Sequence, residues 1–251
     1  MCVDLRFENG RGQTLAGTVH RPRGAPLGSV VICHGLLSHR KSPKHDMLAR
    51  GLASRGLVAL RFDFAGRGES QGRTEDITFE GQIQDLGAAV SVARAAASPV
   101  ALVGSSMGGA VAILHAARDP SMCCVVGIST VGRPGSVLES LVRETPEDVW
   151  RDAGAIDLAG HRLGTELLRS ARRTNVVEAA RELSCPLLLV HGERDEVVPL
   201  RDAEELARAA SHARLEVIAA GDHVLHRQED MDALARLAVP FVVEQVTSAN
   251  A

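Results

Sequence analysis

The chain has 251 residues, of which 45% are apolar and 24% charged, values close to those of an ordinary folded domain. Its 28 Lys and Arg against 31 Asp and Glu give a net charge of −3, which argues against a protein whose main task is binding nucleic-acid phosphates. Five Phe, one Trp and no Tyr argue against a base-stacking platform. No apolar run approaches the roughly 18 residues of a membrane-spanning helix, so we expect no membrane span.

The N-terminal residues alternate between apolar and polar types and lack the apolar stretch of a signal peptide, so we expect a cytoplasmic protein. The cysteine count is odd and the spacing contains no C-x-x-C motif. We therefore expect five buried, reduced thiols rather than a disulfide framework. The cysteines are Cys2, Cys33, Cys123, Cys124 and Cys185.

The chain begins with a predicted hairpin. Val3, Leu5 and Phe7 alternate with polar residues, the period of a half-buried strand. Asn9-Gly10 then supplies a tight turn, and residues 15–20 return as a second strand.

After the hairpin, short apolar runs alternate with helical stretches, which predicts a mostly parallel sheet with helices on both faces. Strands are predicted at residues 29–33, 57–62, 100–103, 124–129, 186–190 and 215–219, and helices at 43–55, 79–97, 107–118, 200–210 and 231–246. The expected fold class is therefore α/β, with an N-terminal antiparallel hairpin, in a single domain spanning residues 1–251.

One segment interrupts this alternation. Between Val131 and Ser184 we find amphipathic stretches at 137–143 and 165–173 but no convincing buried strand. We interpret residues 132–184 as a small helical lid inserted into the domain.

The segment Gly104-Ser105-Ser106-Met107-Gly108 reads G-x-S-x-G and lies between a predicted strand and a predicted helix. This context predicts a sharp turn that exposes the Ser106 hydroxyl, with small residues on either side because a side chain there would clash. The backbone N–H of Met107 stands at the start of the helix, where it is directed at a developing oxyanion. Ser106 is therefore a candidate nucleophile and Met107 a candidate oxyanion donor.

A serine nucleophile needs a base, and the base needs an acid to orient it. Asp195 and His223 each follow a predicted parallel strand, and such strands end at one edge of a sheet. We therefore expect Ser106, Asp195 and His223 to converge.

Two of these assignments have rivals in the sequence. Glu193 and Glu196 flank Asp195, which we prefer because it precedes the apolar segment 197–199. His226 follows His223 by three residues, and we interpret it as a solvated side chain.

Two further patterns are given a structural interpretation. His34, His39 and His45 lie near one another in sequence, but no carboxylates or thiolates stand at ligand spacing, so no metal site is predicted. We expect His34 to support its loop by hydrogen bonding and the other two to lie on the surface. Gly66-Arg67-Gly68 lacks the Lys-Ser/Thr of a phosphate-binding loop and is expected to form a tight turn near the site.

Residues from about 28 to 245 resemble the α/β-hydrolase superfamily, and in particular small esterases with a short helical lid, of the cinnamoyl/feruloyl esterase and monoacylglycerol lipase kind. The resemblance is carried by His34-Gly35-Leu36-Leu37 and by the segments 63–70, 104–109, 191–199 and 221–224. It implies that Ser106 is the nucleophile, His223 the base and Asp195 the orienting acid. It also implies that the backbone N–H groups of Leu36 and Met107 form the oxyanion hole. The residue after His-Gly is often aromatic in this superfamily, whereas here it is Leu36, which alters the shape expected of the pocket.

We therefore expect a serine hydrolase that cleaves small-molecule carboxylic esters of small to medium acyl groups without a cofactor. A homodimer is left open. An acyl-CoA or other thioesterase, an aminopeptidase, a carbon–carbon bond hydrolase and a non-catalytic ligand-binding protein remain alternatives, whereas a dehalogenase would carry Asp in place of Ser106. Arginines of the insertion could bind coenzyme A phosphates in the thioesterase alternative. They are Arg133, Arg143, Arg151, Arg162, Arg169, Arg172 and Arg173.

Overall fold

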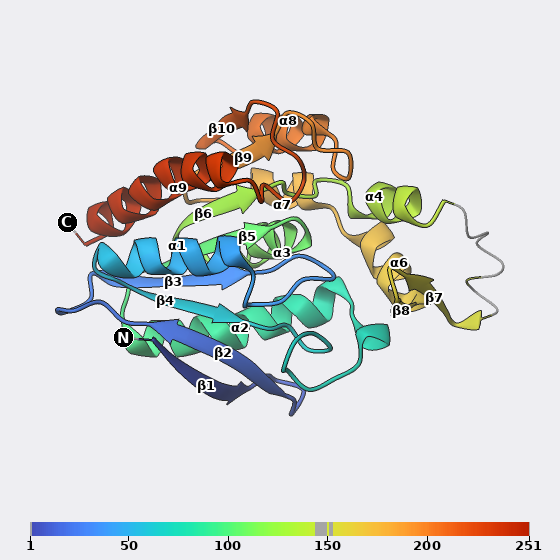
Figure 1. Ribbon diagram of the computed structural model, residues 1–251, viewed down its shortest axis with the longest axis horizontal. Helices are drawn as coiled ribbons and strands as arrows, with labels where there is room; N and C mark the ends of the chain where they lie inside the picture. Colours follow the sequence, from blue (N-terminus) through green and yellow to red (C-terminus); the bar gives the residue numbers. More distant parts are fainter. Residues whose placement is uncertain (1, 144–149, 151–152, 251) are drawn as a thin grey trace.

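The computed structural model describes residues 2–143, 150 and 153–250, and its centre is an eight-stranded sheet (Figure 1). In spatial order the strands are β1 (Cys2–Glu8), β2 (Thr14–His20), β4 (Leu57–Phe62), β3 (Gly28–Cys33), β5 (Val100–Ser105), β6 (Met122–Ile128), β9 (Leu187–Gly192) and β10 (Ala213–Ile218). β1, β2 and β4 pair antiparallel, and all pairs from β4 to β10 are parallel. The predicted fold class and N-terminal hairpin are confirmed.

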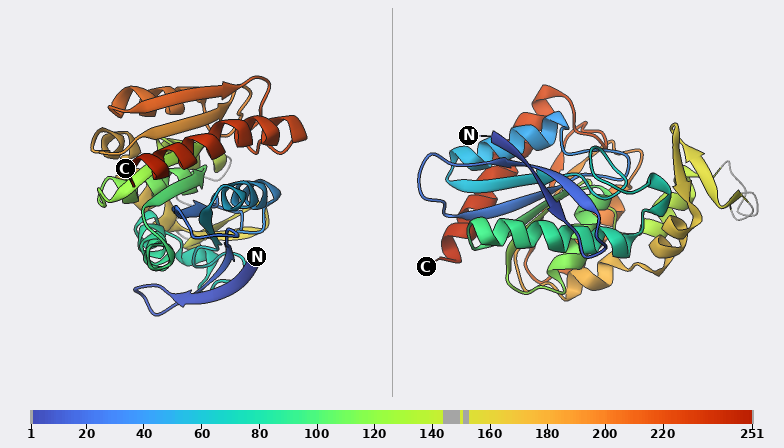
Figure 2. Two further views of the ribbon diagram at one scale, coloured as in Figure 1. Left: turned by 90° about the vertical axis from the view of Figure 1, so that its left-hand side faces the viewer. Right: turned by 90° about the horizontal axis from the view of Figure 1, so that it is seen from below.

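Helices cover both faces of the sheet, as the two orthogonal views of Figure 2 show. α1 (Pro43–Ser54) and α9 (Gln228–Ser248) pack on one face. α2 (Phe79–Ala96), α3 (Met107–Ala116) and α8 (Leu200–Ala209) pack on the other. Every residue of β3, β4, β5 and β9 is buried, which explains why these strands read as continuous apolar runs rather than as alternating patterns.

Local side chains account for where helices α1 and α2 begin. Pro43 occupies the first turn of α1, where its missing N–H leaves no bond unmade. The Thr78 hydroxyl accepts a hydrogen bond from the Gly81 N–H at 3.0 Å and so caps α2. α3 differs because Ser106, the candidate nucleophile, occupies its N-cap position.

Most of the described residues between β6 and β9 lie at the end of the molecule opposite both termini, whereas the last helix of this segment packs against α3 and α8 (Figures 1 and 2). The described elements of the segment are α4 (Pro134–Leu141), β7 (Ala155–Leu158), β8 (His161–Gly164), α6 (Thr165–Arg173) and α7 (Val176–Arg181). The segment is thus not purely helical, because β7 and β8 form a separate antiparallel sheet. Strands of four residues are too short to produce a recognisable period. The role of residues 132–184 as a lid stays a prediction.

The expectation of five buried cysteines is wrong for two of them. Cys2 is exposed and Cys123 is half-buried, whereas Cys33, Cys124 and Cys185 are buried. Cys2 lies in β1, an edge strand whose first residues face solvent. All five thiols are free.

Candidate active site

The turn from β5 into α3 holds Ser106 in a strained backbone conformation. Its φ of 55° lies in the left-handed region, which costs a residue with a side chain about 1–3 kcal/mol. The Ser106 N–H donates to the Ile128 carbonyl at 2.8 Å, so the strained residue is tied to the neighbouring strand β6. This conformation places the hydroxyl at the apex of the turn.

Glycines permit this turn because three backbones approach one another closely. A methyl group on Gly104 would overlap the Gly108 backbone, and one on Gly108 would lie 2.8 Å from the Cys33 carbonyl oxygen. A methyl group on Gly109 would overlap the Thr130 hydroxyl. The predicted need for small residues around Ser106 therefore has a direct steric basis.

The three residues predicted to converge do meet at the carboxyl edge of the sheet. His223 Nε2 lies 3.1 Å from Ser106 Oγ, and His223 Nδ1 lies 2.8 Å from Asp195 Oδ2. Because an ionised carboxylate can only accept, Nδ1 carries the proton and Nε2 is left to accept from the serine hydroxyl. The imidazole is thus held in the tautomer that general-base chemistry requires.

Both carboxylate oxygens of Asp195 have hydrogen-bond partners. Its side chain is fully buried, and Oδ1 accepts hydrogen bonds from the backbone N–H groups of Val197 at 2.9 Å and Val198 at 2.8 Å. His191 Nε2 lies 3.4 Å from Oδ2. Burial raises the pKa of this carboxyl, but the His223 contact and the two N–H donors outweigh it and hold the pKa below its ordinary value.

The rivals of these residues lie outside the hydrogen-bonded chain. Glu193 and Glu196 are exposed, and the former accepts a hydrogen bond from the Ala220 N–H at 2.9 Å. His226 has 67% of its side chain exposed and pairs with Asp222 at 3.2 Å.

The two proposed oxyanion donors flank Ser106. Met107 is the first residue of α3, so its N–H has no acceptor within the helix. On the other side, the Gly35 carbonyl accepts from His34 Nδ1 at 2.7 Å and from the Ser38 N–H at 3.2 Å. In a trans peptide the Leu36 N–H is directed away from that carbonyl. The same peptide passes close to the nucleophile, because a methyl group on Gly35 would lie 3.8 Å from Ser106 Oγ.

His34 supports this turn as expected. Its Nε2 accepts from the Phe64 N–H at 3.1 Å, and burial lowers its pKa to about 4, so it is neutral at pH 7. The expectation that His45 lies on the surface is wrong. His45 is buried, its Nε2 lies 3.2 Å from Ser105 Oγ, and burial lowers its pKa well below the ordinary value. Its helical spacing to Leu48 and Leu52 places it on the inner face of α1, a signal already present in the sequence.

Lys44 is a further residue that sequence reasoning missed. Its ammonium is buried and donates to the carbonyl of Val224, next to His223, at 2.8 Å. Burial lowers the pKa of Lys44 to about 8, although the carboxylates of Asp222 and Asp195 oppose that shift. Lys44 thereby links the loop that carries His223 to the start of α1.

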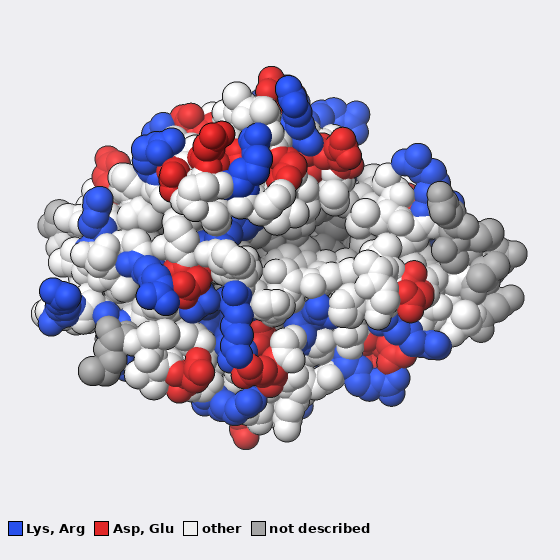
Figure 3. Space-filling model, in the orientation of Figure 1, with Lys and Arg blue, Asp and Glu red and all other residues white. Residues whose placement is uncertain are grey.

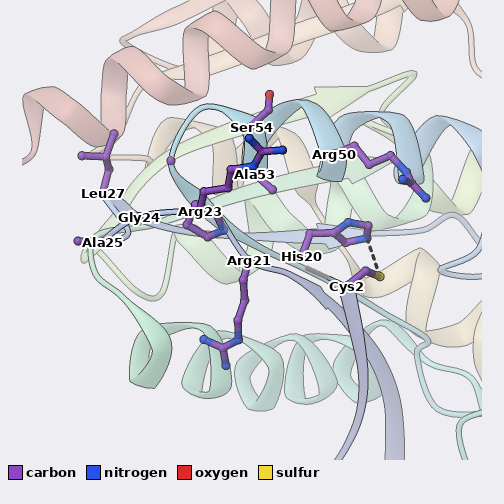
Figure 4. A pocket seen from close by; sticks show the side chains of 12 residues that line it. Cys2, His20, Arg21, Arg23, Gly24, Ala25, Leu27, Arg50, Ala53 and Ser54 are labelled. Atoms are coloured by element: carbon purple, nitrogen blue, oxygen red, sulfur yellow. Dashed lines mark hydrogen bonds between the residues drawn. The ribbon is translucent and has the colours of Figure 1, made fainter.

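The surface is hollowed between this edge of the sheet and the insertion (Figure 3). The walls visible in that view are formed mostly by residues that are neither acidic nor basic. A second pocket, of about 860 Å³, lies at the opposite edge, lined by Cys2, His20 and three arginines among others. Figure 4 shows that Arg21 points away from Arg23, so the cationic groups there do not converge.

Within residues 2–143, 150 and 153–250, no three His, Cys, Asp or Glu side chains are grouped so that they could hold a metal ion. Over the same residues, no helix has both the length and the apolar character needed to cross a bilayer.

The sequence of this chain is similar to those of several known proteins. A family model described as serine aminopeptidase, S33, matches residues 24–147 and 139–230. Human monoglyceride lipase is 28% identical over 256 residues, covering 88% of this chain and 83% of the lipase. Mouse mitochondrial palmitoyl-protein thioesterase ABHD10 is 27% identical over 217 residues, covering 82% of this chain and 72% of the thioesterase.

Among solved structures, Est1E from Butyrivibrio proteoclasticus with bound ferulic acid superposes with a TM-score of 0.86. The match covers 96% of this chain and 99% of Est1E at 21% sequence identity, and we take from it the fold alone. That fold is the one the resemblance predicted.

Proposed function

This chain belongs to the serine aminopeptidase S33 family and is an α/β-hydrolase of esterase/lipase type, and from that premise we propose that it hydrolyses carboxylic esters through an acyl-enzyme on Ser106. The observation that carries the proposal is the hydrogen-bonded chain from Ser106 through His223 to Asp195, at 3.1 and 2.8 Å. A non-catalytic protein that merely retained the fold would not need this alignment.

The proposed reaction proceeds in two halves. His223 Nε2 takes the Ser106 proton as the oxygen attacks the acyl carbonyl, and Asp195 stabilises the resulting imidazolium. The Leu36 and Met107 N–H groups hold the oxyanion, each contributing about 3 kcal/mol to the transition state. The alcohol leaves with the proton from His223, and water then repeats the sequence to release the acid.

The proposed substrate is an uncharged ester. The mostly uncharged walls of the hollow favour a neutral molecule over one with a free ammonium, which an aminopeptidase must bind. Coenzyme A is also disfavoured, because five arginines of the insertion already pair with glutamates, all at 3.5 Å or less. The pairs are Arg133–Glu205, Arg162–Glu75, Arg169–Glu166, Arg172–Glu139 and Arg173–Glu80.

Two further arginines of the insertion are Arg143 and Arg151. Arg143 donates to the Ser140 hydroxyl at 2.9 Å, and Arg151 lies outside the described residues.

Similarity to palmitoyl-protein thioesterase ABHD10 favours a second candidate, the hydrolysis of S-acylated peptides. Ser106 would attack the same acyl carbonyl, and an S-acyl peptide carries no coenzyme phosphates. The ratio of kcat/KM for an oxygen ester and a thioester of the same acyl chain distinguishes the two. A cytoplasmic location and a homodimer remain predictions.

The first experiment combines active-site labelling with an ester panel. We expect a fluorophosphonate probe to label the protein, and p-nitrophenyl acetate, butyrate and octanoate to be turned over. Both activities should disappear in Ser106→Ala. Ser105→Ala is the matched control, because that hydroxyl contacts His45 instead, and it should retain labelling. A folded protein that neither labels nor turns over any ester or thioester would overturn the proposal.

A further inference from the structure

The loop between β4 and α2 is shaped to turn one arginine inward. Gly66 and Gly68 both have positive φ, 79° and 54°, so the backbone on either side of Arg67 adopts conformations that favour glycine. A methyl group on Gly66 would overlap the Arg73 backbone, and one on Gly68 would overlap the Asp63 carboxylate. The Arg67 side chain between them is buried.

One side of the Arg67 guanidinium faces the turn that carries a proposed oxyanion donor. Arg67 Nη2 donates to the Leu37 carbonyl at 2.8 Å, and Nε lies 3.4 Å from the Ser38 carbonyl. The Ser38 N–H in turn donates to the Gly35 carbonyl at 3.2 Å, so Leu36 and Leu37 are the central residues of this turn. By holding the Leu37 carbonyl, Arg67 fixes the Leu37–Ser38 peptide, whose N–H closes the turn onto the Gly35 carbonyl of the peptide that carries the Leu36 N–H.

The other side of the guanidinium faces the insertion. Arg67 Nη1 lies 3.3 Å from His161 Nδ1, in strand β8, and 3.5 Å from the Thr74 hydroxyl. The nitrogen of a neutral imidazole can accept from the arginine, which has only donors. Arg67 therefore contacts both the turn that carries the Leu36 N–H and strand β8.

Strand β8 packs against the segment that directly follows the Arg67 loop. Arg162 pairs with Glu75 at 2.7 Å, and the α-carbon of Gly164 packs directly on the Glu75 backbone. Glu75 lies in the short helix η1 (Thr74–Asp76), which follows the Arg67 loop. A shift of the β7–β8 hairpin therefore moves the acceptor that His161 offers to Arg67.

We propose that Arg67 is a positioning residue that couples the seating of the β7–β8 hairpin to the geometry of the Leu36 oxyanion donor. With the hairpin seated, His161 accepts from Nη1 and orients the planar guanidinium so that Nη2 meets the Leu37 carbonyl. Without that acceptor, the turn loses its fixed geometry and the donor is no longer held for the transition state. The inference rests on the proposed function, because it assigns Leu36 to the oxyanion hole.

The test uses Arg67→Met, which removes both contacts, and Arg73→Met as a control arginine from the same region, paired with Glu75. We expect Arg67→Met to lower kcat roughly 10- to 100-fold, the range expected when a catalytic group is displaced rather than deleted. KM should change little, and the affinity for a boronic acid that mimics the tetrahedral state should fall with kcat. Arg73→Met should leave all three values unchanged.

Variants of His161 keep the proposal testable even if Arg67→Met fails to fold, because His161 is only half-buried. His161→Ala should lower kcat severalfold, and His161→Gln, which restores an acceptor, should recover most of the loss. In the Arg67→Met background, His161→Ala should have no further effect on kcat.

An unchanged kcat in folded Arg67→Met, or an unchanged kcat in His161→Ala, would overturn the coupling. Additive losses in the double variant would overturn it as well. If the unmodified protein hydrolyses esters and labels on Ser106 while these variants behave normally, only the coupling fails. If the unmodified protein does neither, the proposed function fails with it.

Discussion

The carboxyl edge of the sheet and the insertion between β6 and β9 hold their charged side chains in opposite ways. At the sheet edge, Asp195 is fully buried and accepts from two backbone N–H groups and an imidazole. In the insertion, Arg169 and Glu166 are each more than half exposed, and their pair spans a single helical turn. Buried groups with several partners are costly to disturb, whereas exposed ion pairs contribute little. Substitutions at the edge should therefore have large effects on chemistry or stability, and those in the insertion small ones.

The largest effect should come from Asp195→Asn. An amide in place of the carboxylate favours the wrong imidazole tautomer, which lowers kcat by about 10⁴-fold in serine hydrolases of this design. We expect the thermal unfolding temperature to change little, because the side chain keeps its shape. Glu193→Gln and Glu196→Gln serve as controls and should leave kcat unchanged. If Asp195→Asn turns over nearly normally, the orienting acid has been misassigned.

Gly108→Ala should cause the largest loss of stability. The added methyl group would meet the carbonyl oxygens of both Cys33 and His34, and neither backbone can move without shifting β3. Overpacking of this kind lowers the free energy of unfolding by about 3 kcal/mol or more when the surroundings are rigid. Gly24→Ala is the matched control, since nothing lies within 4 Å of a methyl group there. Urea denaturation that gives the two variants equal stability would contradict the steric account of the turn.

Acid should weaken the sheet edge before it weakens the insertion. The pKa of His34 is lowered from 6.5 to about 4, so the unfolded chain binds the extra proton at a higher pH than the folded chain does. The contribution of neutral His34 is complete above pH 6.5 and is lost as the pH falls towards 4, about 3 kcal/mol in all. The glutamates paired with Arg162 and Arg173 have pKa values below the ordinary one, because the arginines favour the charged carboxylates, so these glutamates keep their charge to a lower pH than free glutamates do.

Unfolding free energy measured from pH 7 to 4 checks this order. A curve for His34→Gln should be flatter than that of the unmodified protein, although buried His45 adds a slope of the same sign in both. Parallel curves for the two proteins would show that His34 does not carry the acid sensitivity.

The features that depend on local sequence patterns could be predicted from the sequence. Ser106, Asp195 and His223 each follow an apolar run that reads as a strand, and a parallel sheet brings the ends of such runs to one edge. The interior position of Lys44 and the two-sided contacts of Arg67 could not be read in the same way. They depend on which loops meet in space, Val224 for the first and Leu37 and His161 for the second.

The insertion was the least predictable region for a related reason. Its two strands have four residues each, and its arginines pair with partners as distant as Glu75 and Glu205. A charge-rich segment of this kind reads from sequence alone as a solvated face or a phosphate-binding site. Only the positions of the partner glutamates separate the two interpretations.

The smallest effect should come from the insertion arginines, and it decides between those interpretations. Replacing Arg133, Arg169 and Arg172 together by alanine removes three exposed pairs, each worth roughly 0–1 kcal/mol, so the unfolding temperature should fall only slightly. The kcat/KM values for a p-nitrophenyl ester and for an acyl-CoA of the same chain length should change by the same small factor, because neither substrate uses these charges. Cations that bound the coenzyme phosphates would instead lower kcat/KM for the acyl-CoA alone, and added salt would reproduce that loss in the unmodified protein. A selective loss of tenfold or more would therefore move phosphate recognition into the insertion and restore an acyl-CoA as the substrate.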